Sequence, residues 1–214
     1  MANAAIDNDV ILKGVCYGFL GILLGSLPDG PFNYGILGTA RFVLPKALKK
    51  RPPKRFDVAK ADLKKVLAEF ETLEPTDTEA ALAADLEFEA QRQGLPVHAG
   101  ECQLIAMLAL RNLDHVLTGD RNAIKALATL TLPVSIEHRS LEGKFICFEQ
   151  AILHLIAAHG AARVREAICA ERDVDTSMRL CFSCSSPEVP QSSWISGINS
   201  HVADLRSVAG PLLR

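Results

Sequence analysis

The chain has 214 residues, of which 49% are hydrophobic and 22% are charged, and its formal net charge at pH 7 is -2. This composition excludes a wholly disordered or collagen-like chain, and the length is sufficient for a sizeable buried core. So small a net charge excludes nucleic-acid binding through overall charge alone. Any such contact needs a local basic patch.

The cysteines and the apolar amino-terminal stretch bear on location. Six cysteines lie mostly within apolar helical patterns, which favours buried, reduced thiols over a disulfide framework. The stretch 10–27 is nearly long enough to span a bilayer, but it contains Lys13 and four glycines, so we interpret it as a buried helix. The opening MANAAIDND carries acid where a secretory signal needs positive charge. We therefore expect a cytoplasmic protein with no membrane partner.

The first half of the chain opens with a short buried strand at 4–7 that ends in an acid, followed by a small-residue helical pattern at 10–27. A helical rhythm resumes at 34–48 and stops at the prolines of 51–53. An amphipathic stripe then predicts a helix over 58–73. This part begins as a β-α unit.

The second half continues the alternation. Thr76 or Asp77 can cap a helix that ends near Gly94. The elements expected next are a helix opening at 100–101, a strand at 115–118, a helix at 122–130 and a last strand at 132–136. Strands that alternate with helices predict an α/β fold, in which a central parallel sheet is flanked by helices in three layers.

After residue 138 the pattern becomes helical, with apolar stretches at 145–170 and 195–213 and no strand alternation. The simplest partition is an α/β domain over 1–138 and a helical C-terminal extension over 139–214. The apolar positions of the extension suit packing against the domain or against a second copy, so a homodimer is one expectation.

Three acids are expected at one edge of the sheet. Asp7 ends the first strand, Glu101 opens a helix and Asp120 follows the strand at 115–118. In an open parallel sheet the carboxyl ends of the strands form the ligand-binding edge. Clustered carboxylates repel one another, and a hard divalent cation relieves that repulsion. The pattern predicts a Mg²⁺ or Mn²⁺ site that hydrolyses phosphate esters.

The segments IDNDVIL at 6–12, GECQLIA at 100–106 and LTGDR at 117–121 resemble, in order and in rough spacing, the motifs of the PIN domain family of nucleases. The resemblance covers about residues 4 to 135. It implies a PIN-like fold and a metal-dependent ribonuclease that cuts RNA, often as the toxin of a toxin–antitoxin pair. It also implies that Asp7, Glu101 and Asp120 are the catalytic metal ligands.

One departure from the family pattern supports a second hypothesis. The family usually carries a further acid on the helix after the first β-α unit, whereas the segment 38–44 contains Arg41 and no carboxylate. Asp9 is a candidate substitute ligand. Without such a ligand the chain is a degenerate, non-catalytic PIN-like module that binds RNA or protein.

A weaker hypothesis is a phosphatase similar to the haloacid dehalogenases, in which Asp7 and Asp9 form a DxD pair. It requires threonine or valine where Ile11 stands. Each acid also has a structural interpretation, because Asp is favoured at turns and helix caps and Glu101 suits the first turn of a helix.

Three further features bear on possible ligands. The basic run at 46–55 is either a solvated loop or a contact to RNA phosphates. Thr118 is a candidate for holding water or phosphate at the site. Cys181 and Cys184 have CxxC spacing but lack the second ligand pair that structural zinc needs.

Overall fold

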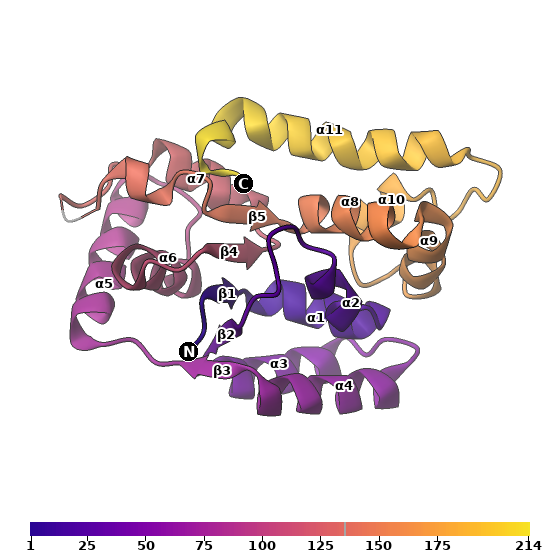
Figure 1. Cartoon of the computed structure of the whole chain (residues 1–214), viewed down its shortest axis with the longest axis horizontal. Helices are drawn as coiled ribbons and strands as arrows, with labels where there is room; N and C mark the ends of the chain where they lie inside the picture. Colours follow the sequence, from indigo (N-terminus) through magenta and orange to yellow (C-terminus); the bar gives the residue numbers. More distant parts are fainter. Residues whose placement is uncertain (135) are drawn as a thin grey trace.

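A computed structural model describes residues 1–134 and 136–214 (Figure 1). Within these residues the centre is a five-stranded sheet in the order β3-β2-β1-β4-β5, with every pairing parallel. Its strands are β1 (Ala4–Ile6), β2 (Tyr34–Leu37), β3 (Glu71–Leu73), β4 (His115–Thr118) and β5 (Phe145–Cys147). The predicted α/β class with a central parallel sheet is confirmed.

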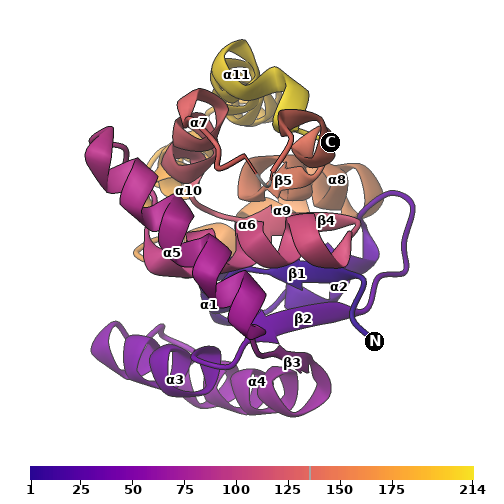
Figure 2. The same ribbon diagram turned by 90° about the vertical axis from the view of Figure 1, so that its left-hand side faces the viewer.

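Helices cover both faces of the sheet, so its strands carry apolar side chains on both sides. Ala4 and Ile6 of β1 point into one core, and Ala5 between them points into the other. The first core contains residues of α1 (Asn8–Tyr17), α2 (Leu20–Gly25), α3 (Ala40–Lys50), α4 (Phe56–Glu69), α8 (Phe148–His159), α9 (Ala161–Ala170) and α10 (Thr176–Cys181). The second contains residues of α5 (Asp77–Arg92), α6 (Ala99–Arg111) and α7 (Arg121–Thr129). The layers are helix, sheet and helix (Figure 2).

The last long helix, α11 (Gln191–Ala209), joins the two cores. Trp194 and Ile198 near its start belong to the first core, whereas Leu205 and Ala209 near its end belong to the second. Figure 1 shows it running across one side of the molecule beside α7 and α8. Two 3-10 turns, His138–Leu141 and Gly210–Leu212, complete the elements of the described residues.

Elements with strong local signals form where the sequence predicts them. The strand expected at 115–118 is β4. The side chain of Thr76 accepts the Glu79 backbone N–H, and Glu79 Oε2 accepts the Thr76 N–H at 2.8 Å, so a reciprocal capping box starts α5. These contacts lie within one helical turn and are therefore readable from the sequence.

Four expected helices are shorter than predicted. The pattern at 10–27 divides into α1 and α2 at Gly18, whose φ of 76° is left-handed and whose missing Cβ leaves room for the Arg55 guanidinium. The stretches 34–48, 58–73 and 145–170 each contain a three- or four-residue strand that adjoins a helix, namely β2, β3 and β5. A strand this short is too brief to show its own periodicity beside an apolar helix.

The fifth strand is not where we expected it. No strand occupies residues 132–134 or 136, and Ser135 lies outside the described residues. Instead β5 pairs with β4, with Ile146 opposite Leu117. The interpretation of 139–214 as wholly helical is therefore wrong for 145–147. The fifth strand of the sheet therefore comes from beyond residue 138, where we expected the α/β domain to end.

The cysteines also differ from expectation. Cys169 and Cys184 form a disulfide, so the prediction that all thiols are reduced is wrong for this pair. Cys16, Cys102, Cys147 and Cys181 are free and buried, as the apolar patterns around them indicate. Among the described residues, no helix combines the length and the apolar character that crossing a membrane requires.

Candidate functional site

The candidate site lies along the carboxyl edge of the sheet, where acids follow three of the strands. Asp7 comes directly after β1 and is the N-cap residue of α1, and its N–H donates to the Leu117 carbonyl at 2.9 Å. Asp120 follows β4 and caps α7. Glu149 follows β5 in the first turn of α8. Because the strands are parallel, these three carboxylates lie along the same carboxyl edge of the sheet.

Asp7 has the most perturbed surroundings of the predicted ligands. Burial first, then the negative charges of Asp9 and Glu101, raise the pKa of Asp7 to about 7. The Thr118 hydroxyl donates to Asp7 Oδ2 at 3.3 Å and partly opposes this rise. The structure therefore brings Asp7, Asp9 and Glu101 into electrostatic contact, and Asp7 exchanges its proton near neutral pH in the absence of a cation.

Glu101 and Asp120 each use one carboxylate oxygen for helix capping. Glu101 Oε2 accepts the His98 N–H at 2.9 Å. Asp120 Oδ1 accepts the N–H groups of Asn122 and Ala123 at 2.8 and 3.0 Å. Both acids therefore act as helix-capping residues, as the structural interpretation of their positions expects. The other oxygen of each accepts no hydrogen bond from the described side chains and backbone, so it is free for a ligand.

Thr118, the last residue of β4, links two of these acids. Its hydroxyl donates to Asp7 and accepts the Asp120 N–H at 3.1 Å, and its side chain is buried. Because this hydroxyl both donates and accepts a hydrogen bond, it fixes the position of Asp7 relative to the start of α7. Thr118 therefore positions the site.

Asp9 is engaged by a lysine. Lys13, one turn later on α1, places Nζ 2.7 Å from Asp9 Oδ2 and 2.5 Å from Asp175 Oδ2. A Cβ atom at residue 119 would overlap Asp9 Oδ2, so Gly119 leaves the space that Asp9 occupies. Although burial opposes it, the two carboxylates hold the pKa of Lys13 above its usual value. Lys13 and Asp175 were not singled out from the sequence.

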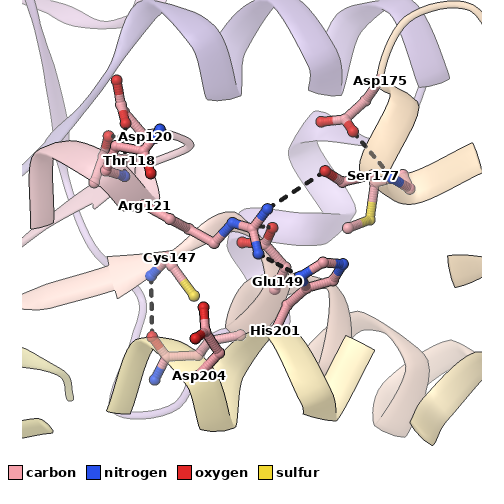
Figure 3. A network of polar contacts seen from close by, with 12 residues as sticks. Thr118, Asp120, Arg121, Cys147, Glu149, Asp175, Ser177, His201 and Asp204 are labelled. Carbon is pink, nitrogen blue, oxygen red and sulfur yellow. Dashed lines mark hydrogen bonds and ion pairs between the residues drawn. The ribbon is translucent and has the colours of Figure 1, made fainter. Parts of the chain in front are cut away.

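A second polar network begins beside Asp120 (Figure 3). The Arg121 side chain extends away from Asp120 and places Nε 3.1 Å from Glu149 Oε1. Its terminal nitrogens reach His201 Nδ1 at 2.5 Å and Ser177 Oγ at 3.4 Å. Glu149 is buried and its Oε2 has no hydrogen-bond partner among the described residues. This network attaches α8, α10 and α11 to the carboxyl edge.

The sequence contains a pattern that could have marked Glu149 as a strand-end acid, but the apolar helix that follows hides it. The run FICF at 145–148 followed by an acid has the same form as the first strand followed by Asp7. Because the apolar pattern continues into α8, we interpreted it as helix throughout. The contacts of Arg121 and Asp175 carry no such signal, since their partners lie far away in the sequence.

Oxygen donors of this kind are the ligands that Mg²⁺ and Mn²⁺ prefer. Within residues 1–134 and 136–214, however, no three acidic, histidine or cysteine side chains already surround one point as a closed metal shell. The donor chemistry fits a divalent ion, and the coupling of Asp7 to Glu101 is in place. Asp120 is linked to Asp7 through the Thr118 hydroxyl, and among the described residues no contact joins its carboxylate to Asp7 or Glu101.

Two other expectations can be located. In the basic run, Lys46, Lys49 and Lys50 are exposed on α3, whereas the N–H groups of Lys54 and Arg55 bind the Glu171 carboxylate at 2.8 and 2.9 Å. These contacts use the backbone, so the exposed side chains of Arg51 and Lys54 also remain available to phosphates, whereas Arg55 pairs with Asp62 at 3.7 Å. Cys184 is bonded to Cys169, which removes it from any CxxC zinc site.

Of two cavities, the larger lies away from the predicted ligands and the smaller is lined by one of them, Glu101. A groove of about 970 Å³ opens among α1, α2 and α4, near the amino ends of the strands. Behind the site, a cavity of about 20 Å³ is lined by Glu101, Thr118 and apolar side chains and has room for about one water molecule. Asp7, Glu101 and Asp120 are each partly exposed, so a ligand can reach them from solvent.

Comparison with known proteins adds no relative. No protein-family model, no curated protein and no solved structure matches the chain.

Proposed function

We propose that the protein is a divalent-metal-dependent, PIN-like nuclease that hydrolyses phosphodiester bonds of RNA at the carboxyl edge of the sheet. The observation that carries the proposal is the environment of Asp7, whose pKa is raised to about 7 by burial and by the charges of Asp9 and Glu101. Such like-charge crowding disfavours the ionised form of Asp7 unless a cation joins the cluster.

Asp7, Glu101 and Asp120 are the proposed metal ligands. Asp7 lies at the junction of β1 and β4, and the other two each keep one oxygen free. A bound Mg²⁺ or Mn²⁺ would supply an activated water and stabilise the charge that develops on the phosphate. The protein's own part is to fix the carboxylates, which Thr118 and the two helix caps do.

RNA is the proposed substrate because of the resemblance in motifs, and the exposed lysines of α3 support a polyanionic ligand. Lys46, Lys49 and Lys50 lie on the helix that follows β2, and β2 is a neighbour of β1 in the sheet. Each lysine that neutralises a phosphate releases condensed counterions, so binding through them should weaken with salt.

The test is cleavage of a fluorescent single-stranded RNA with Mn²⁺ or Mg²⁺ by the wild type, Asp7→Asn and Asp120→Asn. Loss of a metal ligand should lower the rate by about 100-fold or more, since the ion contributes several kcal/mol to transition-state stabilisation. Asp57→Asn is the matched control, because Asp57 is an exposed first-turn acid of α4, away from the site. A folded wild type that neither cleaves RNA nor binds metal would refute the proposal.

The second candidate is a non-cleaving PIN-like module that binds RNA or protein. The ion pairs of Lys13 with Asp9 and Asp175 favour it, because an internal ammonium neutralises part of the acidic cluster without a metal. The absence of a carboxylate from the sequence 38–44 points the same way. RNA binding that is unchanged by chelators, with no cleavage, would establish this candidate in place of the first.

The phosphatase alternative has less support. An aspartyl nucleophile reacts in its ionised form, whereas the pKa of Asp7 is about 7. Trapping a phosphoryl group on Asp7 with a small phosphate ester would revive it. An antitoxin partner is implied by the motif resemblance. The apolar positions of the extension that suggested a homodimer, among them Phe148, Ile152 and Leu155, pack within the chain's own first core, so a second copy would need another surface. Size measurement with and without candidate partners tests both.

A further inference from the structure

The basic residues of the chain are concentrated in one helical hairpin, formed by α3, α4 and the residues that join them. Residues 41–65 contain ten lysines and arginines and two acids, whereas the rest of the chain contains 13 lysines and arginines and 23 acids. The two helices lie side by side next to β3 (Figure 2). A chain with a formal net charge of -2 thus has one strongly positive surface, the feature by which proteins attract polyanions.

Most of these cations have no acidic partner. The exceptions are the ion pairs Arg55–Asp62 at 3.7 Å and Lys65–Glu69 at 3.9 Å. The exposed side chains that pair with no carboxylate among the described residues are those of Lys46, Lys49, Lys50, Arg51, Lys54, Lys60 and Lys64. These seven charges are therefore available to a ligand.

The fold by itself does not require this surplus of positive charge. The dipole of α3 favours Lys49 and Lys50, because both lie in its last turn. Lys60 and Lys64, however, lie one turn apart within α4, where like charges repel. The surplus is therefore better explained by a ligand than by helix stability.

An exposed aromatic side chain lies in line with the lysines of α3. Phe42 is 71% exposed, although burial of so large an apolar side chain is favourable. Lys46, Lys49 and Lys50 follow it by four, seven and eight residues, so all four side chains share one face of the helix. Surfaces that bind single-stranded nucleic acids combine such cations, which contact phosphates, with aromatic rings on which bases stack.

The aromatic end of this face is also the end nearer to the proposed site. The helix α3 begins shortly after Leu37, the last residue of β2, and therefore starts at the carboxyl edge of the sheet. A Cβ atom at Gly100, the neighbour of Glu101, would lie 4.0 Å from a methyl carbon of Leu37. A strand held along α3 would therefore reach the carboxyl edge at its Phe42 end.

We propose that this face of α3, formed by Phe42, Lys46, Lys49 and Lys50, binds single-stranded nucleic acid, with phosphates on the lysines and one unpaired base stacked on Phe42. The inference rests on the proposed function for the identity of the strand as RNA, and it adds that the substrate is unpaired. An anionic bilayer is a poorer partner. The apolar residues of α3 and α4, among them Leu44, Leu48 and Leu63, are buried in the first core, so the hairpin has no continuous apolar face to insert.

The first experiment measures the affinity for a short fluorescent single-stranded RNA by anisotropy, in a chelator and at several salt concentrations. The triple variant Lys46→Gln/Lys49→Gln/Lys50→Gln should bind more weakly, and its slope of log K against log salt should be shallower by about 2, because each phosphate contact to a single strand contributes about 0.7. The control Arg139→Gln/Arg163→Gln/Arg172→Gln removes three exposed cations outside the hairpin and should leave the slope unchanged.

The second experiment tests stacking on Phe42. Phe42→Ala should weaken binding of the single strand about 5- to 100-fold at an unchanged salt slope, because stacking involves no counterion release. Binding of the same RNA as a duplex should not change, since paired bases do not offer their faces. The control Phe88→Ala truncates a phenylalanine of α5 that is 64% exposed, and it should bind like the wild type. All of these side chains are exposed, so the fold should tolerate every change.

The outcomes separate this inference from the function beneath it. A wild type that binds single-stranded RNA through these side chains but never cleaves it would refute the proposed nuclease and leave the binding surface in place. A wild type that cleaves RNA, while both hairpin variants bind and cleave as it does, would overturn the inference alone. So would a wild type that binds no RNA in a chelator, or a triple variant that loses affinity for phosphatidylserine vesicles and not for RNA.

Discussion

Arg121 and Glu149 join the end of β4 to the start of α8 through an ion pair of 3.1 Å, in which the carboxylate is almost fully buried (Figure 3). Truncating Arg121 to methionine leaves a buried charge without a partner, which costs about 3–5 kcal/mol of unfolding free energy. Urea denaturation at pH 8 measures this loss. The double variant Arg121→Met/Glu149→Met should recover most of it, and additive losses from the two single changes would contradict the coupling.

Asp7 should make the protein less stable as the pH rises. Its folded pKa of about 7 lies above the ordinary aspartate value of 3.8, so between about pH 4 and pH 7 the folded state holds a proton that the unfolded chain has released. Stability from this group therefore falls across that window. The effect is at most about 4 kcal/mol, and solvent at this half-buried carboxyl reduces it.

The measurement is the free energy of unfolding of wild type and Asp7→Asn at several pH values in a chelator. Asp7→Asn should be the more stable protein at pH 8, and the difference should shrink toward pH 4. Saturating Mn²⁺ should reverse the order, because an ion compensates the charge in the wild type only. An Asp7→Asn variant that is less stable at pH 8 without metal would contradict the expected direction.

His115 should produce the opposite dependence. Burial, and then the positive charges of Arg214 and Lys144, lower its pKa from 6.5 to about 4. Because the unfolded chain takes up a proton first, this histidine stabilises the fold fully above about pH 6.5 and loses that contribution as the pH falls toward 4. Its ring Nε2 lies 3.1 Å from the Tyr34 hydroxyl.

Since the two windows overlap, the His115 effect is best measured in the Asp7→Asn background. The melting temperature of that variant should fall between pH 7 and pH 4.5. An NMR titration of the His115 ring should show a midpoint near pH 4. A midpoint near 6.5 would mean that the ring is hydrated and that the buried contact with Tyr34 is broken.

The Cys169–Cys184 disulfide should stabilise the C-terminal helices. It closes a loop across a sequence separation of 15 residues, for which chain-entropy arguments give about 3 kcal/mol. Cys169→Ser/Cys184→Ser should therefore unfold at lower urea concentration than the oxidised wild type. A reductant should bring the wild type to the level of the variant and leave the variant unchanged. Equal stability of all four samples would show that the bond contributes nothing.

How far the sequence predicts the molecule depends on the range of each interaction. The helix cap and the strand before Asp120 are local: the sequence offers Thr76 or Asp77 for the cap, which Thr76 takes, and it places the strand at 115–118, where β4 lies. The strands β2, β3 and β5 escaped because three or four buried residues beside a helix satisfy a helical pattern equally well. Only pairing with a neighbouring strand decides between strand and helix, and such pairing cannot be predicted from one segment alone.

The same reason applies to the site. Asp7, Glu101 and Asp120 were named because strand ends and helix starts are recognisable. In the sequence Lys13 speaks only against a membrane span, and nothing marks Asp175 as part of the site. Their ion pair connects α1 to the cap of α10 and exists only after the whole chain has folded.

The strand β5 forms one border of the sheet, and the residues that follow α11 return to it. Leu213 bridges Phe145 in parallel, and the Arg214 N–H donates to the Phe145 carbonyl at 2.9 Å. An uncovered border strand is a template on which another molecule can add a strand and begin to aggregate. Leu213 and Arg214 thus cover part of this edge strand and hinder another molecule from pairing with it. A protein truncated at residue 138 would lack β5 and would expose β4 as the edge strand.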